Sequence, residues 1–354
     1  MIDILKDILP YISGLYTLPW IPIGFIVTMA IAKCTGRERI DAVMKKIGLI
    51  LLYFFVPLLL FRIFLNTNFG TSEIEFAIVV SAVIFFMYAL AFWYARYQSS
   101  KQGLTRLKRN LYLKTVLTNQ GRSSAFIGGA ILAIEAWAVP AGIYIALVGI
   151  ALFAIIPYIL SRMHRRESKH PEQSEHIRAL PWHLKLFPWY LIAFVVAAVT
   201  LHTTTGMTTE MFGDWGTILR FYTAITIPAA LYYVGSGIHP RDLKLLELKK
   251  LFGADKKQKG GDHWIWVRNI FFLTFILTPL LTVLVFTPLF AIGAISSAWF
   301  AVIIINSVLP ITSTNMFLIS YGIDKKSTAL SVTWTTIICV PIVVILITVF
   351  GTYL

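Results

Sequence analysis

The sequence predicts an all-α integral membrane protein with about ten transmembrane helices, arranged as two inverted repeats of five. Of its 354 residues, 57% are hydrophobic and 14% are charged, whereas soluble domains carry about 25% charged residues. The mean hydropathy is +0.75. The apolar runs are long and continuous, which is unlike the alternating strands of a membrane β-barrel. The charges gather in every second connection between these runs.

The apolar runs are long enough to span a bilayer, since a transmembrane helix needs about 20 mostly apolar residues. Two of them, the fourth and the ninth, are interrupted by polar residues. The predicted spans lie near 17–34, 45–66, 75–95, 110–134, 137–161, 186–203, 215–238, 265–288, 292–320 and 328–352.

The charge distribution predicts the orientation of these spans. Of the 31 basic residues, 27 lie in five alternating segments, which are 33–46, 96–114, 162–185, 241–268 and 321–327. Seven of the 17 acidic residues lie at the opposite ends of the spans. By the positive-inside rule, we expect a multi-pass protein of the cell membrane with both termini outside. The basic residues behind the net charge of +14 then determine the membrane topology. Membrane lipids are an expected partner, and nucleic acid is not.

The spans divide into two halves that we expect to have opposite orientations, because each half contains an odd number of spans. Residues 1–162 form the first five-helix repeat, 163–185 an inner basic linker, and 186–354 the second repeat. Prolines recur at matching places in the second and fifth helices of the halves: Pro57, Pro228, Pro157 and Pro341.

The fourth and ninth spans are interrupted near 119–124 and 308–315, in each case at mid-membrane. Polar residues at that depth are costly unless they face protein or a water-filled cavity. Gly121 relaxes the backbone, and Pro310 removes an amide donor. A helix broken there exposes an amide-rich N-terminus with about half a positive charge, which favours an anion.

Arg122 is the one charged residue that the span assignment places at mid-membrane. Its guanidinium group suits a carboxylate or phosphate, which it holds through two parallel hydrogen bonds. The alternatives are that Arg122 is tied to helix carbonyls or snorkels to an interface, and that Asn119 and Asn315 join helices. The candidate substrate-binding residues are Asn119, Gln120, Arg122, Ser123, Ser124, Asn306, Pro310, Thr312, Ser313 and Asn315.

Other side chains supply no recognisable catalytic or metal site. No Asp or Glu is expected at mid-membrane, and the two cysteines, Cys34 and Cys339, lie in apolar segments. We therefore predict no catalytic residue, no metal and no cofactor. Arg62 and Arg220 lie toward the outer ends of their spans, where they either snorkel or form a vestibule that attracts anions.

Two inner segments have a local pattern of their own. Residues Arg241–Phe252 carry leucines at amphipathic spacing, which is typical of a helix on the inner membrane surface or of a solvated connector. Residues 255–263 (DKKQKGGDH) are expected to form a flexible loop.

Several short motifs resemble the auxin efflux carrier (PIN-like) family of membrane permeases. The best match runs from Leu309-Pro310 through Asn315 and the YGID loop 321–324 to the small and hydroxyl residues before Pro341. The segments YFFVPLLLF at 53–61 and YVGSGI at 233–238 are similar to the second and seventh helices of the family. Members often have a proline in the fourth-helix break, where this chain has Arg122, so auxin recognition is not carried over.

The resemblance implies two broken helices that cross, as in the bile-acid sodium symporters. It implies a scaffold of helices one, two, six and seven, and an elevator-like moving part of the other six. It also implies a homodimer.

We expect a secondary transporter or facilitator for a small organic anion, a carboxylate, and not an enzyme. Alternatives are a ligand-binding sensor on a transporter-like fold, or a membrane-embedded enzyme, which would need paired acids or a metal site.

Overall fold

The fold is helical throughout the part of the chain that the computed structural model describes, which is residues 2–9, 19–67, 70–124, 131, 134–168, 182–238, 240, 249 and 262–353. Four helices are long and apolar enough to cross a membrane: Arg37–Leu65, Thr71–Lys101, His263–Ala291 and Lys325–Tyr353. Shorter apolar helices lie at Trp20–Thr35, Ala136–Ile150, Trp189–Thr205 and Ser297–Val308. The chain therefore has the helices of a membrane protein.

The α-helices follow the predicted order of apolar segments. They are α1 (Ile2–Ile8), α2 (Trp20–Thr35), α3 (Arg37–Ile50), α4 (Val56–Leu65), α5 (Thr71–Lys101), α6 (Arg106–Thr118), α7 (Glu135–Ile150), α8 (Ile156–Ser168), α9 (Trp182–Thr205), α10 (Asp214–Ser236), α12 (Asp262–Phe271), α13 (Thr278–Ala291), α14 (Ser297–Val308) and α15 (Lys325–Tyr353). Short 3₁₀ segments, η7 (Thr209–Phe212) and η9 (Ser313–Tyr321), precede α10 and follow α14.

Three of the helices contain a wider, π-helical turn just before a proline. The turns are η3 (Leu51–Phe55), η5 (Ala151–Ile155) and η8 (Phe272–Leu277), and the prolines are Pro57, Pro157 and Pro279. A proline ring clashes with the carbonyl four residues earlier, and that residue lies within the π turn each time. The helix therefore widens instead of ending. Pro228 and Pro341 lie within α10 and α15, whose helical hydrogen bonding continues as α-helix.

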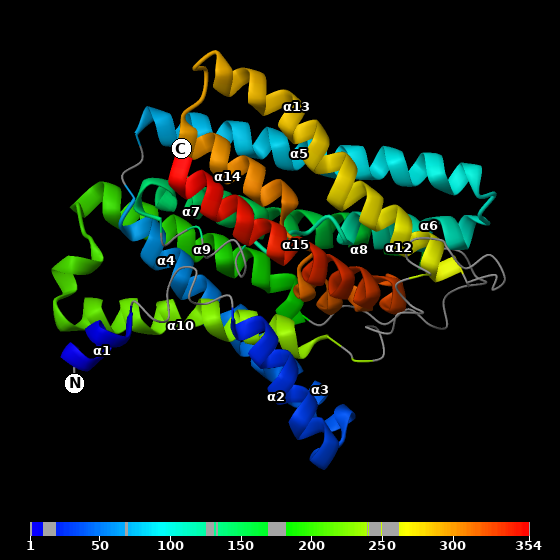
Figure 1. Ribbon diagram of the computed structural model, residues 1–354, viewed down its shortest axis with the longest axis horizontal. Helices are drawn as coiled ribbons and strands as arrows, with labels where there is room; N and C mark the ends of the chain where they lie inside the picture. The colour runs from blue at the N-terminus through cyan, green and yellow to red at the C-terminus, as the bar shows by residue number, and fades with distance from the viewer. Residues whose placement is uncertain are drawn as a thin grey trace.

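The helices pack into two groups that face each other (Figure 1). In one group, α2 packs on α10 and α4 packs on α9 and α10. In the other, α5 packs on α6 and α7, α12 on α15, and α13 on α14. Helix α7 bridges the groups, because it also contacts α4 and α9. Two smaller apolar clusters lie mainly within the second group, among them one that joins Tyr112, Trp266 and Ile311. A third joins η5 and α8 to η9.

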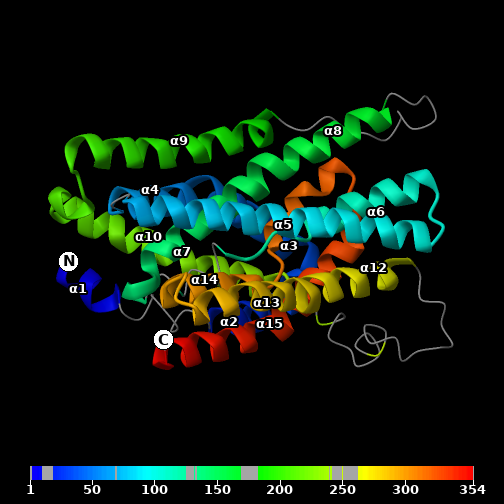
Figure 2. The same ribbon diagram turned by 90° about the horizontal axis from the view of Figure 1, so that it is seen from above.

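Both ends of the chain lie at the same end of the elongated molecule, and the connection between α5 and α6 lies at the other (Figures 1 and 2). The start of α10 is close to the N-terminus in both views. The α5–α6 connection belongs to one of the five basic segments, so that segment lies at the end opposite the termini in both views.

Several boundaries differ from the sequence predictions. Helix α5 runs six residues beyond the predicted span end at 95, and its 31 residues reach about 46 Å at 1.5 Å per residue, which exceeds the roughly 30 Å hydrocarbon core. The expected loop 255–263 is too long, because α12 already begins at Asp262. The proposed amphipathic segment 241–252 lies outside the described residues, apart from Lys249.

Candidate functional site: the crossing of two chain breaks

The two interrupted segments lie against each other and pair through their backbones. Arg122 and Ile311 form an isolated antiparallel bridge. The amide of Ser123 donates to the carbonyl oxygen of Pro310 at 2.9 Å, and the amide of Thr312 donates to that of Gly121 at 2.9 Å. Segments about 190 residues apart therefore meet as a short two-stranded crossing in the interior of the helical protein.

Local sequence explains why each helix stops at the crossing. Leu309 is extended (φ −53°, ψ 143°), as expected for a residue before proline, so α14 ends at Val308. On the other side, α6 ends at Thr118. A Cβ on Gly121 would lie 2.6 Å from Cδ1 of Leu152 and 2.8 Å from Oδ1 of Asn315. Glycine at position 121 thus allows the close approach that the bridge requires.

The pairing limits one part of the sequence prediction, namely that backbone amides at the breaks bind the anion, because several of these amides already have partners. Besides the two bridge bonds, the amide of Ile311 donates to Oγ1 of Thr335 at 3.2 Å. The amide of Thr314 donates weakly to Oγ1 of Thr312 at 3.4 Å, and that of Asn315 donates to a carbonyl oxygen. Two of these five amides thus pair across the breaks, and the other three donate to Thr335 of α15 or within the second break, so none of the five is free for a ligand. Residues 125–130, after the first break, lie outside the described part.

Arg122 is 3% exposed and contacts backbone carbonyls. Its Nη2 donates to the oxygen of Thr274 at 2.9 Å, and its Nη1 donates to that of Leu309 at 3.4 Å. The first contact joins Arg122 to η8. The alternative that Arg122 is tied to helix carbonyls is therefore met by one of its donors. A guanidinium group has five N–H donors, and Nε has no partner among the described residues. Donors therefore remain for a ligand.

The charge of Arg122 is buried without an acidic partner in the described part of the chain. The ion pairs formed there are Arg37–Asp41 and His263–Asp324. The phenol of Tyr144 and the thiol of Cys339 lie close enough to interact electrostatically with Arg122. An uncompensated buried charge costs several kcal/mol, and a bound anion would supply the missing partner.

Unpartnered polar side-chain atoms collect around the crossing. The amide nitrogens of Asn119, Gln120 and Asn306 donate to carbonyl oxygens four residues earlier in the chain, and their amide oxygens have no partner among the described residues. The hydroxyls of Ser123 and Ser124 are in the same state. The amide nitrogen of Asn119 also donates to Oγ1 of Thr328 on α15 at 3.2 Å, so Asn119 joins helices as the alternative expected. Within the two breaks and the last turn of the helix before each, the side chains with unpartnered atoms are Thr118, Asn119, Gln120, Arg122, Ser123, Ser124, Asn306 and Asn315.

The candidate residues thus come together, but two of them already have another partner. The hydroxyl of Thr312 is hydrogen-bonded to that of Thr314 at 3.0 Å, and the carbonyl oxygen of Pro310 accepts a bond of the bridge. The side chain of Ser313 lies outside the described part. Asn315 is fully buried, with both its amide nitrogen and its amide oxygen unpartnered among the described residues, so it is the most available neutral side chain at the crossing.

Sequence reasoning missed Lys114, which it counted with the inner basic segment 96–114. Lys114 is instead 2% exposed and lies on α6 two turns before Arg122. Its Nζ lies 3.4 Å from the carbonyl oxygen of Tyr321. The neighbouring YGID loop is joined to α6, because the amide of Asp324 donates to Oγ1 of Thr115 at 2.9 Å. Lys114 and Arg122 lie eight positions apart in the predicted fourth span, 110–134, and that was the signal available in the sequence.

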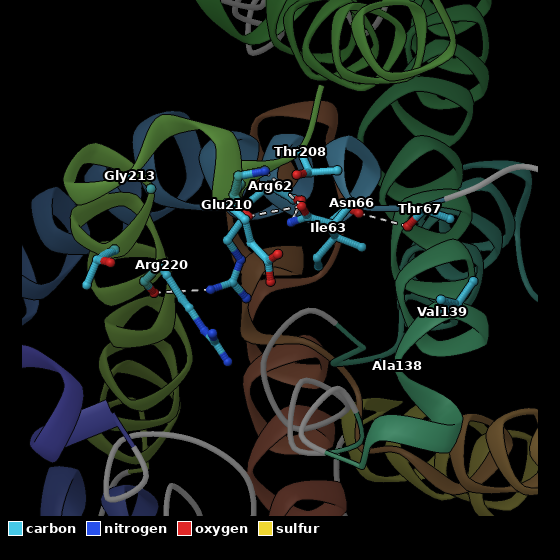
Figure 3. Close-up of a pocket in the computed structure, with 13 residues that line it drawn as sticks. Arg62, Ile63, Asn66, Thr67, Ala138, Val139, Thr208, Glu210, Gly213 and Arg220 are labelled. Atoms are coloured by element: carbon cyan, nitrogen blue, oxygen red, sulfur yellow. Dashed lines mark hydrogen bonds between the residues drawn. The ribbon is translucent and has the colours of Figure 1, made fainter. Parts of the chain in front are cut away.

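A cavity of about 670 Å³ lies at the end of the molecule that carries the termini, between α4, α7, η7 and α10. Both arginines that the sequence placed near span ends, Arg62 and Arg220, line it. Figure 3 shows their side chains directed into one space together with that of Glu210. The lining residues are Arg62, Ile63, Asn66, Thr67, Ala138, Val139, Thr208, Thr209, Glu210, Gly213, Gly216, Thr217 and Arg220.

The described residues contain no group of three or more His, Cys, Asp or Glu side chains placed to hold a metal ion.

The chain matches no model of a protein family, and no curated protein matches it. The resemblance to the auxin efflux carrier family therefore rests on the motifs quoted above.

Proposed function

We propose that the protein is a secondary transporter or facilitator that carries a small organic anion, a carboxylate, across the cell membrane. The observation that carries this proposal is Arg122, a guanidinium group buried between two chain breaks without an acidic partner in the described residues. Buried charges in membrane proteins are rare and mark substrate or ion pathways. A carboxylate would neutralise this charge and accept hydrogen bonds from the guanidinium group and the serine hydroxyls.

In this proposal the ten predicted spans form an inverted repeat, with both termini outside. Transport proceeds by an elevator-like movement of one helix group against the other. The division of packing contacts supports this idea, since α2, α4, α9 and α10 contact mainly one another. The buried state of the crossing also supports it, because a site closed to solvent needs a movement to exchange its ligand. The resemblance to the auxin efflux carrier family points the same way.

Uptake by the purified full-length protein in liposomes tests the proposal. The probes are radiolabelled succinate, malate and benzoate. We expect uptake of at least one acid by the wild type and its loss in Arg122→Gln. The matched control is Arg268→Gln, which removes an exposed arginine on α12 and should retain uptake. Uptake of neutral or cationic solutes in place of all the acids would overturn the assignment of an anion.

A further inference from the structure

The cavity between α4 and α10 contains more positive than negative charge. The guanidinium groups of Arg62 and Arg220 and the carboxylate of Glu210 are its ionisable side chains, so the lining carries a net charge of +1. Glu210 and Arg220 are exposed, and Arg62 is half-buried. Neither arginine forms an ion pair within the described residues. One singly charged oxyanion would balance this cavity.

The two arginines are held beside each other by the backbone. Nη1 of Arg62 donates to the carbonyl oxygen of Arg220 at 3.1 Å (Figure 3). This contact uses one donor of Arg62 and none of the side-chain donors of Arg220. Two like charges in one hollow repel each other, which is a cost that snorkelling side chains would avoid by separating. Their placement in one cavity therefore favours a shared ligand.

The remainder of the cavity is fixed and polar. Oδ1 of Asn66 accepts hydrogen bonds from the amide of Thr209 at 2.9 Å and from its hydroxyl at 3.0 Å, which ties the end of α4 to η7. A Cβ on Gly216 would lie 1.9 Å from the carbonyl oxygen of Thr209, so glycine is needed where η7 packs on α10. Thr208 and Thr217 add hydroxyls to the lining. The volume of about 670 Å³ falls within the range of small-molecule sites, roughly 300–1,000 Å³.

We infer that this cavity is a second binding site, distinct from the crossing, for the carboxylate group of a small organic acid. Arg62 and Arg220 hold the carboxylate, and the hydroxyls of Thr208 and Thr217 contact the rest of the acid. The site lies where the two helix groups meet, because Ala138 and Val139 of α7 form one wall and α4 and α10 form the others. Its role as a first binding step before the crossing rests on the proposed function, whereas binding itself does not.

The test is a calorimetric titration of the full chain in phosphatidylcholine nanodiscs, with benzoate as the probe. Arg220→Gln is the cleanest variant, because the hydrogen bond from Arg62 goes to the backbone of residue 220 and survives the change. We expect benzoate affinity at this site to fall about tenfold or more in Arg220→Gln and in Arg62→Gln, as for the loss of a charge-assisted hydrogen bond. Binding should also weaken with added salt. The matched control is Arg39→Gln, an exposed arginine on α3.

Arg122→Gln separates this inference from the proposed function. If that variant still binds benzoate and the binding is lost on adding Arg220→Gln, the cavity site stands even where uptake fails. If Arg220→Gln and Arg62→Gln bind benzoate as the wild type does, the cavity site is refuted and the transport proposal is untouched. Nanodiscs containing phosphatidylglycerol test the other source of a singly charged oxyanion. Displacement of benzoate by that lipid, lost in Arg220→Gln, would assign the cavity to a lipid headgroup and overturn the small acid.

Discussion

Replacing Gly121 by alanine tests the close approach of the two chain breaks. The added Cβ would lie 2.6 Å from Cδ1 of Leu152 and 2.8 Å from Oδ1 of Asn315, and both distances are too short to keep. Both atoms end flexible side chains, so each moves by a few tenths of an ångström or more. We expect a loss of about 1–3 kcal/mol in the free energy of unfolding, as for other overpacked interiors, together with displacement of the Asn315 amide.

The matched control for this change is Gly149→Ala on α7. A Cβ there would lie 3.4 Å from Cδ2 of Leu191, which is an ordinary contact, and alanine favours a helix over glycine by up to about 1 kcal/mol. Thermal unfolding in detergent should therefore show a lower midpoint for Gly121→Ala and an unchanged or higher one for Gly149→Ala. Uptake should fall in the first variant alone. A Gly121→Ala protein with wild-type stability and uptake would refute the reasoning.

Three further changes test the surroundings of the crossing. Pro310→Ala should reduce uptake more than stability, because the helix can then partly continue through the break. The control Pro288→Ala, near the end of α13, should keep uptake. Equal uptake by the two variants would mean that the helix interruption has no role in transport. Ser123→Ala removes a buried hydroxyl without a partner among the described residues, so unfolding stability should stay within about 1 kcal/mol or rise while acid affinity falls. The control is Ser99→Ala, which removes a hydroxyl that donates to the carbonyl oxygen of Arg96 at 2.8 Å. Its unfolding stability should fall, while its acid affinity should stay at the wild-type value. Asp324→Ala should lower stability by about 0.5–2 kcal/mol in denaturation, because its carboxylate accepts from the amide of Ser327 at 2.7 Å as an N-cap of α15.

The sequence was sufficient for the features that depend on local chemistry. The apolar runs gave the order of the helices, because a helix that must satisfy its own backbone in lipid needs about 20 apolar residues. Pro310 gave the end of α14, since the residue before a proline avoids the helical region. The polar clusters at 119–124 and 308–315 identified the segments that pair.

The sequence could not supply features that depend on which segments meet. The amides of Ser123 and Thr312 are used by the bridge, and no local pattern shows that residues in the other break, Pro310 and Gly121, accept them. The burial of Lys114 depends on the packing of α6 against the loop at Tyr321. The shared cavity of Arg62 and Arg220 likewise requires the packing of α4 on α10.

The prolines show the same limit within single helices. Pro57 and Pro228 occupy matching places in the two halves of the sequence, yet the first follows a π turn and the second lies in a continuous α-helix. A proline therefore does not by itself determine whether a helix widens or continues as α-helix.

The most direct test of the central claim is a thermal-shift titration of the purified protein with small organic acids, compared with Arg122→Gln. A ligand that binds the folded state raises the unfolding temperature by mass action. We predict that at least one acid stabilises the wild type, that Arg122→Gln reduces this shift, and that Arg268→Gln keeps it. An equal shift in Arg122→Gln and the wild type, or stabilisation by neutral and cationic compounds alone, would contradict an anion site at the crossing.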